Sequence, residues 1–135
     1  MSKRRVVVTG LGIVSPVGND VAGAWASVLA GRSGIGPVTR FDTSNFPTHF
    51  GGEIRQLDLT PYLSVKDARR MDAFMQYGVV AGMQAMRDSG LVATEANSDR
   101  IGVLMGIAES DPARQSFVSA FTQALQGLVW RDATA

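Results

Sequence analysis

The sequence predicts an α/β fold in which helices pack on a mixed sheet, and three observations lead to this prediction. Val6–Thr9 is a continuous run rich in β-branched residues, which is typical of a strand covered on both faces. A second apolar run, Arg100–Gly106, has the same character. Between them, Ser64–Gly90 carries the longest helical periodicity in the chain. The order strand, helix, loops, long helix, strand, helix indicates an α/β architecture.

The first helix follows a turn that contains three glycines, which would give the backbone the freedom that a tight turn requires. Asn19 or Asp20 can cap this helix by placing an acceptor at its free amides. Gly31 suits the C-terminal end of the helix. The turn glycines are Gly10, Gly12 and Gly18, and the apolar positions of the helix are Val21, Trp25, Val28 and Leu29.

Residues 31–60 are rich in glycine, proline and threonine, so we expect loops with one short hairpin around Phe50–Leu57. The long helix then begins at a capping box formed by Ser64 and Asp67. Gly90 is expected to end it. Two glycines four residues apart would let another backbone approach the helix closely. The apolar stripe consists of Met71, Phe74, Met75, Gly78, Gly82, Ala85 and Met86, with Val80 and Ala81 beside it.

Beyond the second predicted strand, a last helix is expected. Ser110 or Asp111 can cap it, and Pro112 occupies a first-turn position. Its apolar stripe consists of Phe117, Phe121, Ala124, Leu125 and Leu128.

Composition excludes several classes of function. The chain has 135 residues and a formal net charge of +1, which gives no argument for nucleic acid or an anionic membrane as a partner. It contains no cysteine, so thiol catalysis, disulfides and thiolate metal sites are excluded within this polypeptide. Its single histidine, His49, cannot form a two-histidine site. No run approaches the ~18 apolar residues of a membrane span. We expect no metal, no cofactor and a cytoplasmic location.

The turn after the opening strand is also similar to a dinucleotide-binding fingerprint, and this alternative is weak. Ser15 stands where glycine or alanine is expected. Pro16 and Val17 delay the helix, so its N-terminus would not lie under a pyrophosphate. Arg32–Gly34 occupies the region where an acidic residue should bind the ribose. The glycines are better explained by the turn.

Lys66, Arg69 and Arg70 form a basic cluster, here called the basic triplet. Their spacing places them on one face near the start of the predicted long helix. The ordinary interpretation is a solvated helix face. However, cations at a helix N-terminus oppose the macrodipole, which costs about 0.3–1 kcal/mol each. Asp67 and Asp72 offset part of that cost. The triplet is therefore a candidate docking site for an acidic partner.

Several blocks in the same order resemble the β-ketoacyl-acyl carrier protein synthases, in particular the synthase II type. The first is the opening strand and turn. The others are Leu29–Ile35, Arg40–Ser44, Arg69–Gly78, and Asp88–Leu91 leading to Arg100–Val103. The resemblance runs from about Lys3 to Gly106, roughly the first quarter of a family-length enzyme. We therefore divide the chain into a synthase-like segment, residues 1–106, and a divergent helical tail, residues 107–135.

The resemblance implies a partial thiolase-like fold, an incomplete N-terminal half. It also implies condensation of malonyl and acyl groups held on acyl carrier protein, through a cysteine and two histidines. Those positions lie beyond the matching segment, so no catalytic residue is assigned. In such synthases the basic residues before the Met-Asp-Ala-Phe block contact the acidic carrier protein. Here they are Lys66, Arg69 and Arg70.

Three hypotheses follow. The first is a truncated synthase that is inactive alone, because the cysteine and the histidine pair are absent. The second is a non-catalytic module that binds carrier protein or pairs with a full-length synthase. The third is a fragment without an evolved function, whose uncovered sheet edges lead to self-association.

Overall fold

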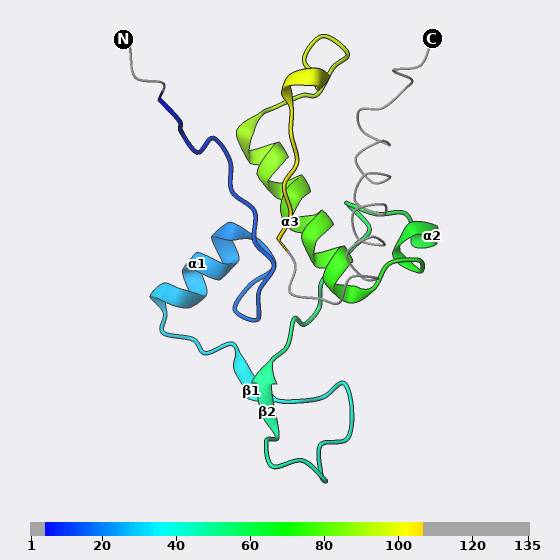
Figure 1. Cartoon of the computed structure of the whole chain (residues 1–135). Coiled ribbons are helices and arrows are strands. Elements are labelled where there is room, and N and C mark those ends of the chain that lie inside the picture. Colours follow the sequence, from blue (N-terminus) through cyan, green and yellow to red (C-terminus); the bar gives the residue numbers. More distant parts are fainter. Residues whose placement is uncertain (1–4, 107–135) are drawn as a thin grey trace.

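The computed structural model describes residues 5–106, in which three helices, one short 3-10 helix and one two-stranded sheet form (Figure 1). The longest element, α3, passes through the middle of the molecule. The elements are α1 (Val21–Leu29), β1 (Ile35–Pro37), β2 (Phe50–Gly52), α2 (Val65–Ala68), α3 (Ala73–Ser89) and the 3-10 helix η1 (Ser98–Arg100). The last predicted helix lies outside the described residues.

The two predicted buried strands are wrong. Val6–Thr9 is extended but unpaired, and Val6 and Val8 are 92% and 80% exposed. Residues 101–106 are likewise irregular, and Leu104 is 97% exposed. A β-branched run becomes a strand only when a neighbouring strand takes its hydrogen bonds, and within residues 5–106 neither segment has one. The predicted mixed sheet is therefore not formed there.

The N-terminal segment is held against α3 instead. The Leu11 N–H donates to the Asp88 carboxylate at 2.8 Å, and the Ile13 N–H donates to the Gln84 side-chain carbonyl at 3.0 Å. The amide nitrogen of Gln84 donates in turn to the Asn19 carbonyl at 2.7 Å. Two polar side chains of α3 thus take over part of the role of a neighbouring strand. The segment runs down between α1 and α3 in Figure 1.

Gly10 and Gly12 are required by this packing, and not by the shape of the turn. A Cβ on Gly10 would collide with the Ala85 carbonyl and the Ser89 backbone, and one on Gly12 with the backbone of Ala81. Neither glycine has a positive φ angle. The predicted approach of another backbone to the long helix therefore occurs. Gly10 and Gly12 of the N-terminal segment permit this approach.

The ends of α1 agree with the prediction. The Asp20 carboxylate accepts from the Gly23 N–H at 2.7 Å and caps the helix. At the other end, Gly31 has φ of 63° and donates to Val28, while the Arg32 N–H bonds to the Ser27 carbonyl. These two bonds form a Schellman motif, which accounts for glycine at this position. The predicted apolar face is not buried, because only Ala24 is buried in α1.

The hairpin was expected in the wrong place. β2 falls inside the predicted region, but its antiparallel partner is β1, with Ile35 opposite Gly52 and Pro37 opposite Phe50. The loop between the strands carries Phe41 and Phe46 in an edge-to-face contact, with ring centroids 5.8 Å apart. This pairing spans a long loop, so the local sequence pattern around β2 could not reveal it.

The predicted long helix is broken into α2 and α3. Asp72 is extended, with ψ of 158°, and serves as the N-cap position of α3. The Gln76 amide donates to the carbonyls of Ala68 and Met71 at 2.9 and 3.1 Å. This side chain satisfies carbonyls that lose their helical partners at the break. Gly90, with φ of 66°, ends α3 as predicted.

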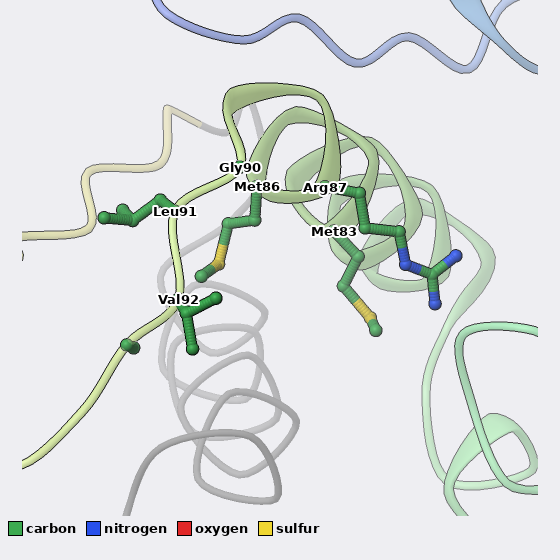
Figure 2. Close-up of a pocket in the computed structure, with 7 residues that line it drawn as sticks. Met83, Met86, Arg87, Gly90, Leu91 and Val92 are labelled. Carbon is green, nitrogen blue, oxygen red and sulfur yellow. The ribbon is translucent and has the colours of Figure 1, made fainter.

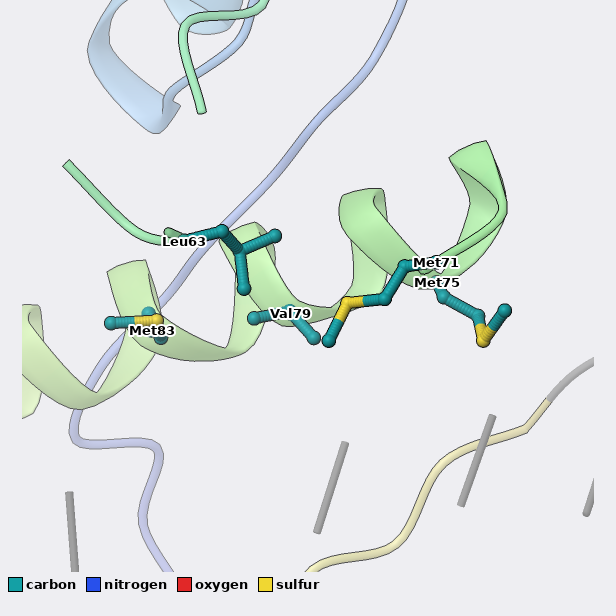
Figure 3. Packing of buried hydrophobic residues seen from close by; sticks show 5 residues of the cluster. All are labelled: Leu63, Met71, Met75, Val79 and Met83. Atoms are coloured by element: carbon teal, nitrogen blue, oxygen red, sulfur yellow. The ribbon is translucent and has the colours of Figure 1, made fainter. Parts of the chain in front are cut away.

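The core lies along one side of α3 (Figure 3). Its members are Leu63, Met71, Met75, Val79 and Met83. Met71 and Met75 belong to the predicted stripe, whereas Met83 lies outside it. Val79 is 1% exposed although it lies outside the predicted stripe. Met105 packs against this cluster, so the segment after η1 returns along α3.

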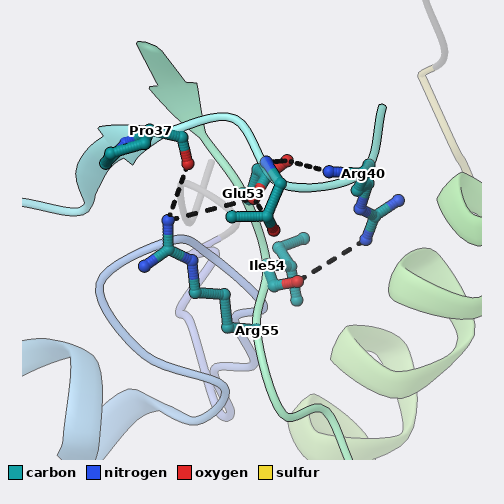
Figure 4. A network of polar contacts seen from close by, with 6 residues as sticks. Pro37, Arg40, Glu53, Ile54 and Arg55 are labelled. Carbon is teal, nitrogen blue, oxygen red and sulfur yellow. Dashed lines mark hydrogen bonds and ion pairs between the residues drawn. The ribbon is translucent and has the colours of Figure 1, made fainter. Parts of the chain in front are cut away.

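Glu53 ties the start of the β1–β2 loop to the residues after β2 (Figure 4). Its carboxylate accepts from the Thr39 N–H at 2.9 Å, the Thr39 hydroxyl at 2.8 Å and the Arg40 N–H at 3.2 Å. Arg55 lies 3.9 Å from the same carboxylate and donates to the Pro37 carbonyl at 3.1 Å. The bonds from Thr39 are the main cause that lowers the pKa of Glu53 below its ordinary 4.5.

Replacing this carboxylate should change the pH dependence of stability. A lowered folded-state pKa stabilises the fold above the ordinary pKa, and the contribution is lost as pH falls through the folded-state pKa. We expect Glu53→Gln to be less stable than the parent chain at pH 7, with a difference that shrinks towards pH 3. Urea unfolding at both pH values measures it, with Glu95→Gln as the control on an exposed carboxylate. If the stability difference between the two proteins stayed constant from pH 7 to pH 3, the pKa of Glu53 would not be lowered in the folded state.

Candidate functional site: the basic junction between α2 and α3

The structure places the basic triplet at the junction of α2 and α3. Lys66 lies in α2, Arg69 is its C-cap residue, and Arg70 follows in the turn that leads to α3. The Arg69 N–H donates to the Val65 carbonyl and the Arg70 N–H to the Asp67 carbonyl. One hydrogen-bonded turn therefore carries all three side chains, and all three are exposed.

The backbone of this turn is fixed at both ends. Ser64 caps α2, because its hydroxyl oxygen accepts from the Asp67 N–H at 3.1 Å and its hydroxyl donates to the Asp67 carboxylate at 2.6 Å. The predicted cap by Ser64 is confirmed, but Asp67 bonds to the serine hydroxyl and not to the serine N–H, so the box is only half formed. At the other end, Gln76 bonds to the carbonyls of Ala68 and Met71, on either side of the two arginines. The triplet thus stands on a turn that capping and side-chain hydrogen bonds hold in place.

The break changes the electrostatic argument for the triplet. Lys66 is the second residue and Arg69 the C-cap of a helix of only four residues, so neither opposes a long macrodipole. The cost inferred from a continuous helix therefore does not apply. With the rest of residues 5–106, the triplet makes no ion pair and no side-chain hydrogen bond, so its cations are available to an incoming partner. Asp67 and Asp72 are close in sequence and reduce the local positive charge.

An apolar groove that the sequence did not predict adjoins the triplet. Its volume is about 350 Å³, and Arg69 forms part of its wall. Val65, the first residue of α2, also lines it and is 64% exposed. The other lining residues are Leu59, Thr60, Leu63, Ala68 and Gln76. The sequence signal was an apolar residue directly after the capping serine, where it had no place in the predicted stripe.

A second cavity of about 350 Å³ lies at the C-terminal end of α3. Figure 2 shows Met86 and Val92 pointing toward each other across it. Its one charged lining residue, Arg87, is already engaged: it donates to the Pro61 carbonyl at 2.8 Å and lies 4.8 Å above the Tyr62 ring. The lining is therefore mainly an apolar packing surface, and Arg87 is held by its contacts with Pro61 and Tyr62.

His49 lies in the exposed loop between β1 and β2, where its Nδ1 is 3.4 Å from the Thr43 hydroxyl. No group of three potential metal ligands occurs among the described residues. In the same part of the chain no helix has the length and apolar content needed to cross a membrane. These observations add no second chemical site to the basic triplet.

The family model described as "Beta-ketoacyl synthase, N-terminal domain" matches residues 3–130. The chain therefore belongs to the β-ketoacyl synthase family. The family predicted from the ordered sequence blocks is thereby confirmed. The described residues form a ketosynthase-like N-terminal domain of helices with a two-stranded antiparallel sheet.

Curated relatives carry a more specific name. The chain is 57% identical over 106 residues to the 3-oxoacyl-[acyl-carrier-protein] synthase 2 of Vibrio cholerae, which covers 78% of this chain and 26% of that protein. The chain is 44% identical over 103 residues to the 3-oxoacyl-[acyl-carrier-protein] synthase 2 of Staphylococcus aureus strain COL. This match covers 76% of this chain and 25% of that protein. The chain thus spans about a quarter of the length of the curated relatives it matches.

A solved structure is also similar. The ishigamide ketosynthase/chain length factor superposes with a TM-score of 0.58 at 36% identity, covering 67% of this chain and 22% of that chain. The division of our chain at residue 106 stays a prediction. The curated match to Vibrio cholerae spans 106 residues, whereas the family model continues to residue 130.

Proposed function

We propose that this chain is the carrier-protein-binding N-terminal part of a 3-oxoacyl-[acyl-carrier-protein] synthase 2, and that it does not catalyse condensation alone. The observation that carries the proposal is the exposed basic triplet without partners among the described residues, in a chain of this family. Family membership also supports a thiolase-like fold, of which these residues form part of the N-terminal half. A cytoplasmic location is part of the same proposal.

The proposed inactivity rests on chemistry. The family reaction joins a malonyl-derived carbanion to an acyl group held as an enzyme thioester, which requires a thiolate nucleophile. The chain has no cysteine and one histidine. His49 lies in an exposed loop beside a threonine. Within residues 5–106, the Ser15 hydroxyl donates to the Gly18 carbonyl and not to a base that could activate it.

The proposed binding rests on charge. Exposed cations that lack intramolecular partners can pair with carboxylates of an incoming protein without breaking any existing contact. Such pairs direct encounter and orientation more than they add affinity, and salt screens them. The fixed backbone of the α2–α3 turn reduces the entropy lost when the three side chains are engaged.

Two assays on the purified chain test the proposal. Incubation with acyl-loaded and malonyl-loaded acyl carrier protein should give no two-carbon-extended product, whereas the complete Vibrio cholerae synthase 2 should give it. Titration with fluorescently labelled carrier protein should give saturable binding that weakens as salt rises. Product formation would overturn the proposed inactivity. Absence of binding at low salt would overturn the proposed docking.

A second candidate role is pairing with another copy or with a full-length synthase. It is favoured by the segment Val6–Thr9, whose valine side chains are exposed and whose backbone has no strand partner in residues 5–106. Unpaired extended segments of this kind accept strands from other chains. Sedimentation velocity of the chain alone tests self-association, and a monomer at every concentration would count against it.

A further inference from the structure

The apolar groove beside the basic triplet has the properties of a docking pocket. We propose that it receives an apolar side chain of the acyl carrier protein, one that stands beside the carboxylates engaged by Lys66, Arg69 and Arg70. This inference rests on the proposed function and adds a specific contact to it. It assigns the groove a role in selecting the partner, since charges alone would admit any acidic surface.

The chemistry of the lining defines the occupant as apolar. Leu59, Leu63, Val65 and Ala68 offer only hydrocarbon surface. The Thr60 hydroxyl is already bonded to the Asp58 carboxylate at 2.7 Å. The amide nitrogen of Gln76, the other uncharged polar lining residue, is occupied by two backbone carbonyls. Away from Arg69, a polar group that entered the groove would therefore lose hydration and find few free hydrogen-bond partners.

The position of Arg69 defines the neighbouring charge. Arg69 belongs both to the groove lining and to the basic triplet, so the apolar and cationic parts of the surface are continuous. A partner that fills the groove thus brings its adjacent residues next to unpaired cations. Carboxylates flanking one apolar side chain, as on an acidic amphipathic helix, match this arrangement.

A second copy of this chain fits the same surface less well. A two-fold contact would place each triplet near the other, because such an interface uses the same patch on both subunits. Like charges brought together in this way oppose association. The charge of the surface therefore favours an acidic partner over self-pairing at this site.

Val65→Ala tests the groove separately from the charges. The valine is exposed at the first position of α2, so its removal should leave the fold intact. We expect carrier-protein affinity to fall by about threefold to tenfold, from the lost apolar contact. The slope of affinity against salt concentration should stay unchanged. Val28→Ala, at a 53% exposed position on α1, is the matched control and should bind as the parent does.

A second measurement does not depend on substitution. In a methyl-labelled sample, the methyl resonances of Leu59, Leu63 and Val65 should shift when unacylated carrier protein is added, while those of Val28 should not. If reversing the triplet abolishes binding but Val65→Ala binds normally and the groove methyls do not shift, the groove inference is wrong and the proposed function stands. If the parent chain does not bind carrier protein at all, the proposed function itself fails.

Discussion

Gly12→Ala should destabilise the chain by more than about 3 kcal/mol, at the upper end of the cost of overpacking. The new Cβ would overlap the backbone of Ala81 and lie 2.9 Å from the Ala85 nitrogen. Both belong to the middle of α3, where the backbone cannot move aside without breaking helical hydrogen bonds. The N-terminal segment must move instead, and the bonds from Leu11 and Ile13 to α3 would then be lost.

Urea unfolding measures the loss of stability, and hydrogen exchange shows which part of the chain is destabilised. We expect the amides of residues 5–19 to lose protection while those of Val79 and Val80, deep in α3, keep it. Gly102→Ala is the matched control, since its added Cβ meets nothing within 4 Å and its φ is not positive. It should change stability by less than about 0.5 kcal/mol. Equal stability of the two variants would disprove the close approach to α3.

Reversing all three charges of the basic triplet should weaken carrier-protein binding about 100-fold. An exposed ion pair contributes roughly 0.2–1 kcal/mol, and reversal replaces attraction by repulsion of similar size. Three such sites amount to about 3 kcal/mol, or roughly two powers of ten in affinity. The variant is Lys66→Glu, Arg69→Glu, Arg70→Glu, measured by the same titration at low and moderate salt. Because salt screens repulsion as well as attraction, its remaining affinity should no longer weaken as salt rises.

The control for this variant must carry the same net charge. Each reversal removes one positive and adds one negative charge, so three of them take the formal net charge from +1 to −5. Reversing Arg5, Arg32 and Arg100, which are exposed and lie outside the α2–α3 junction, produces the same net charge. This control should keep most of the affinity. Equal losses in the two variants would mean that overall charge, and not the basic triplet, governs binding.

Local signals in the sequence predicted the helix ends well. Asp20, Ser64 and Gly90 each act through atoms within a few residues, so their roles follow from the neighbouring sequence. The break between α2 and α3 was missed because its stabilising contacts come from the Gln76 side chain, which a periodicity of apolar residues does not register. The strand β1 was missed because it contains glycine and proline, which are unfavourable in strands.

The candidate site was predicted only in part. The three cations were identified from their spacing and from the family resemblance, and their exposure agrees with a binding role. The groove could not be predicted, because it forms where residues 59–63 meet α2 and α3. The Val6–Thr9 prediction failed for a related reason. Strand propensity is local, whereas a strand also needs a neighbouring strand that local sequence cannot supply.

The hydrogen bonds that attach the N-terminal segment to α3 also constrain the order of folding during synthesis. Leu11 and Asp88 are separated by 77 residues, and Ile13 and Gln84 by 71. The ribosome must therefore complete almost the whole of α3 before the first residues of the chain can find their partners. Contacts of such sequence separation form late and slowly. The segment around Leu11 and Ile13 is thus the part that waits longest for its partners, and the part that chaperones would need to shield in the meantime.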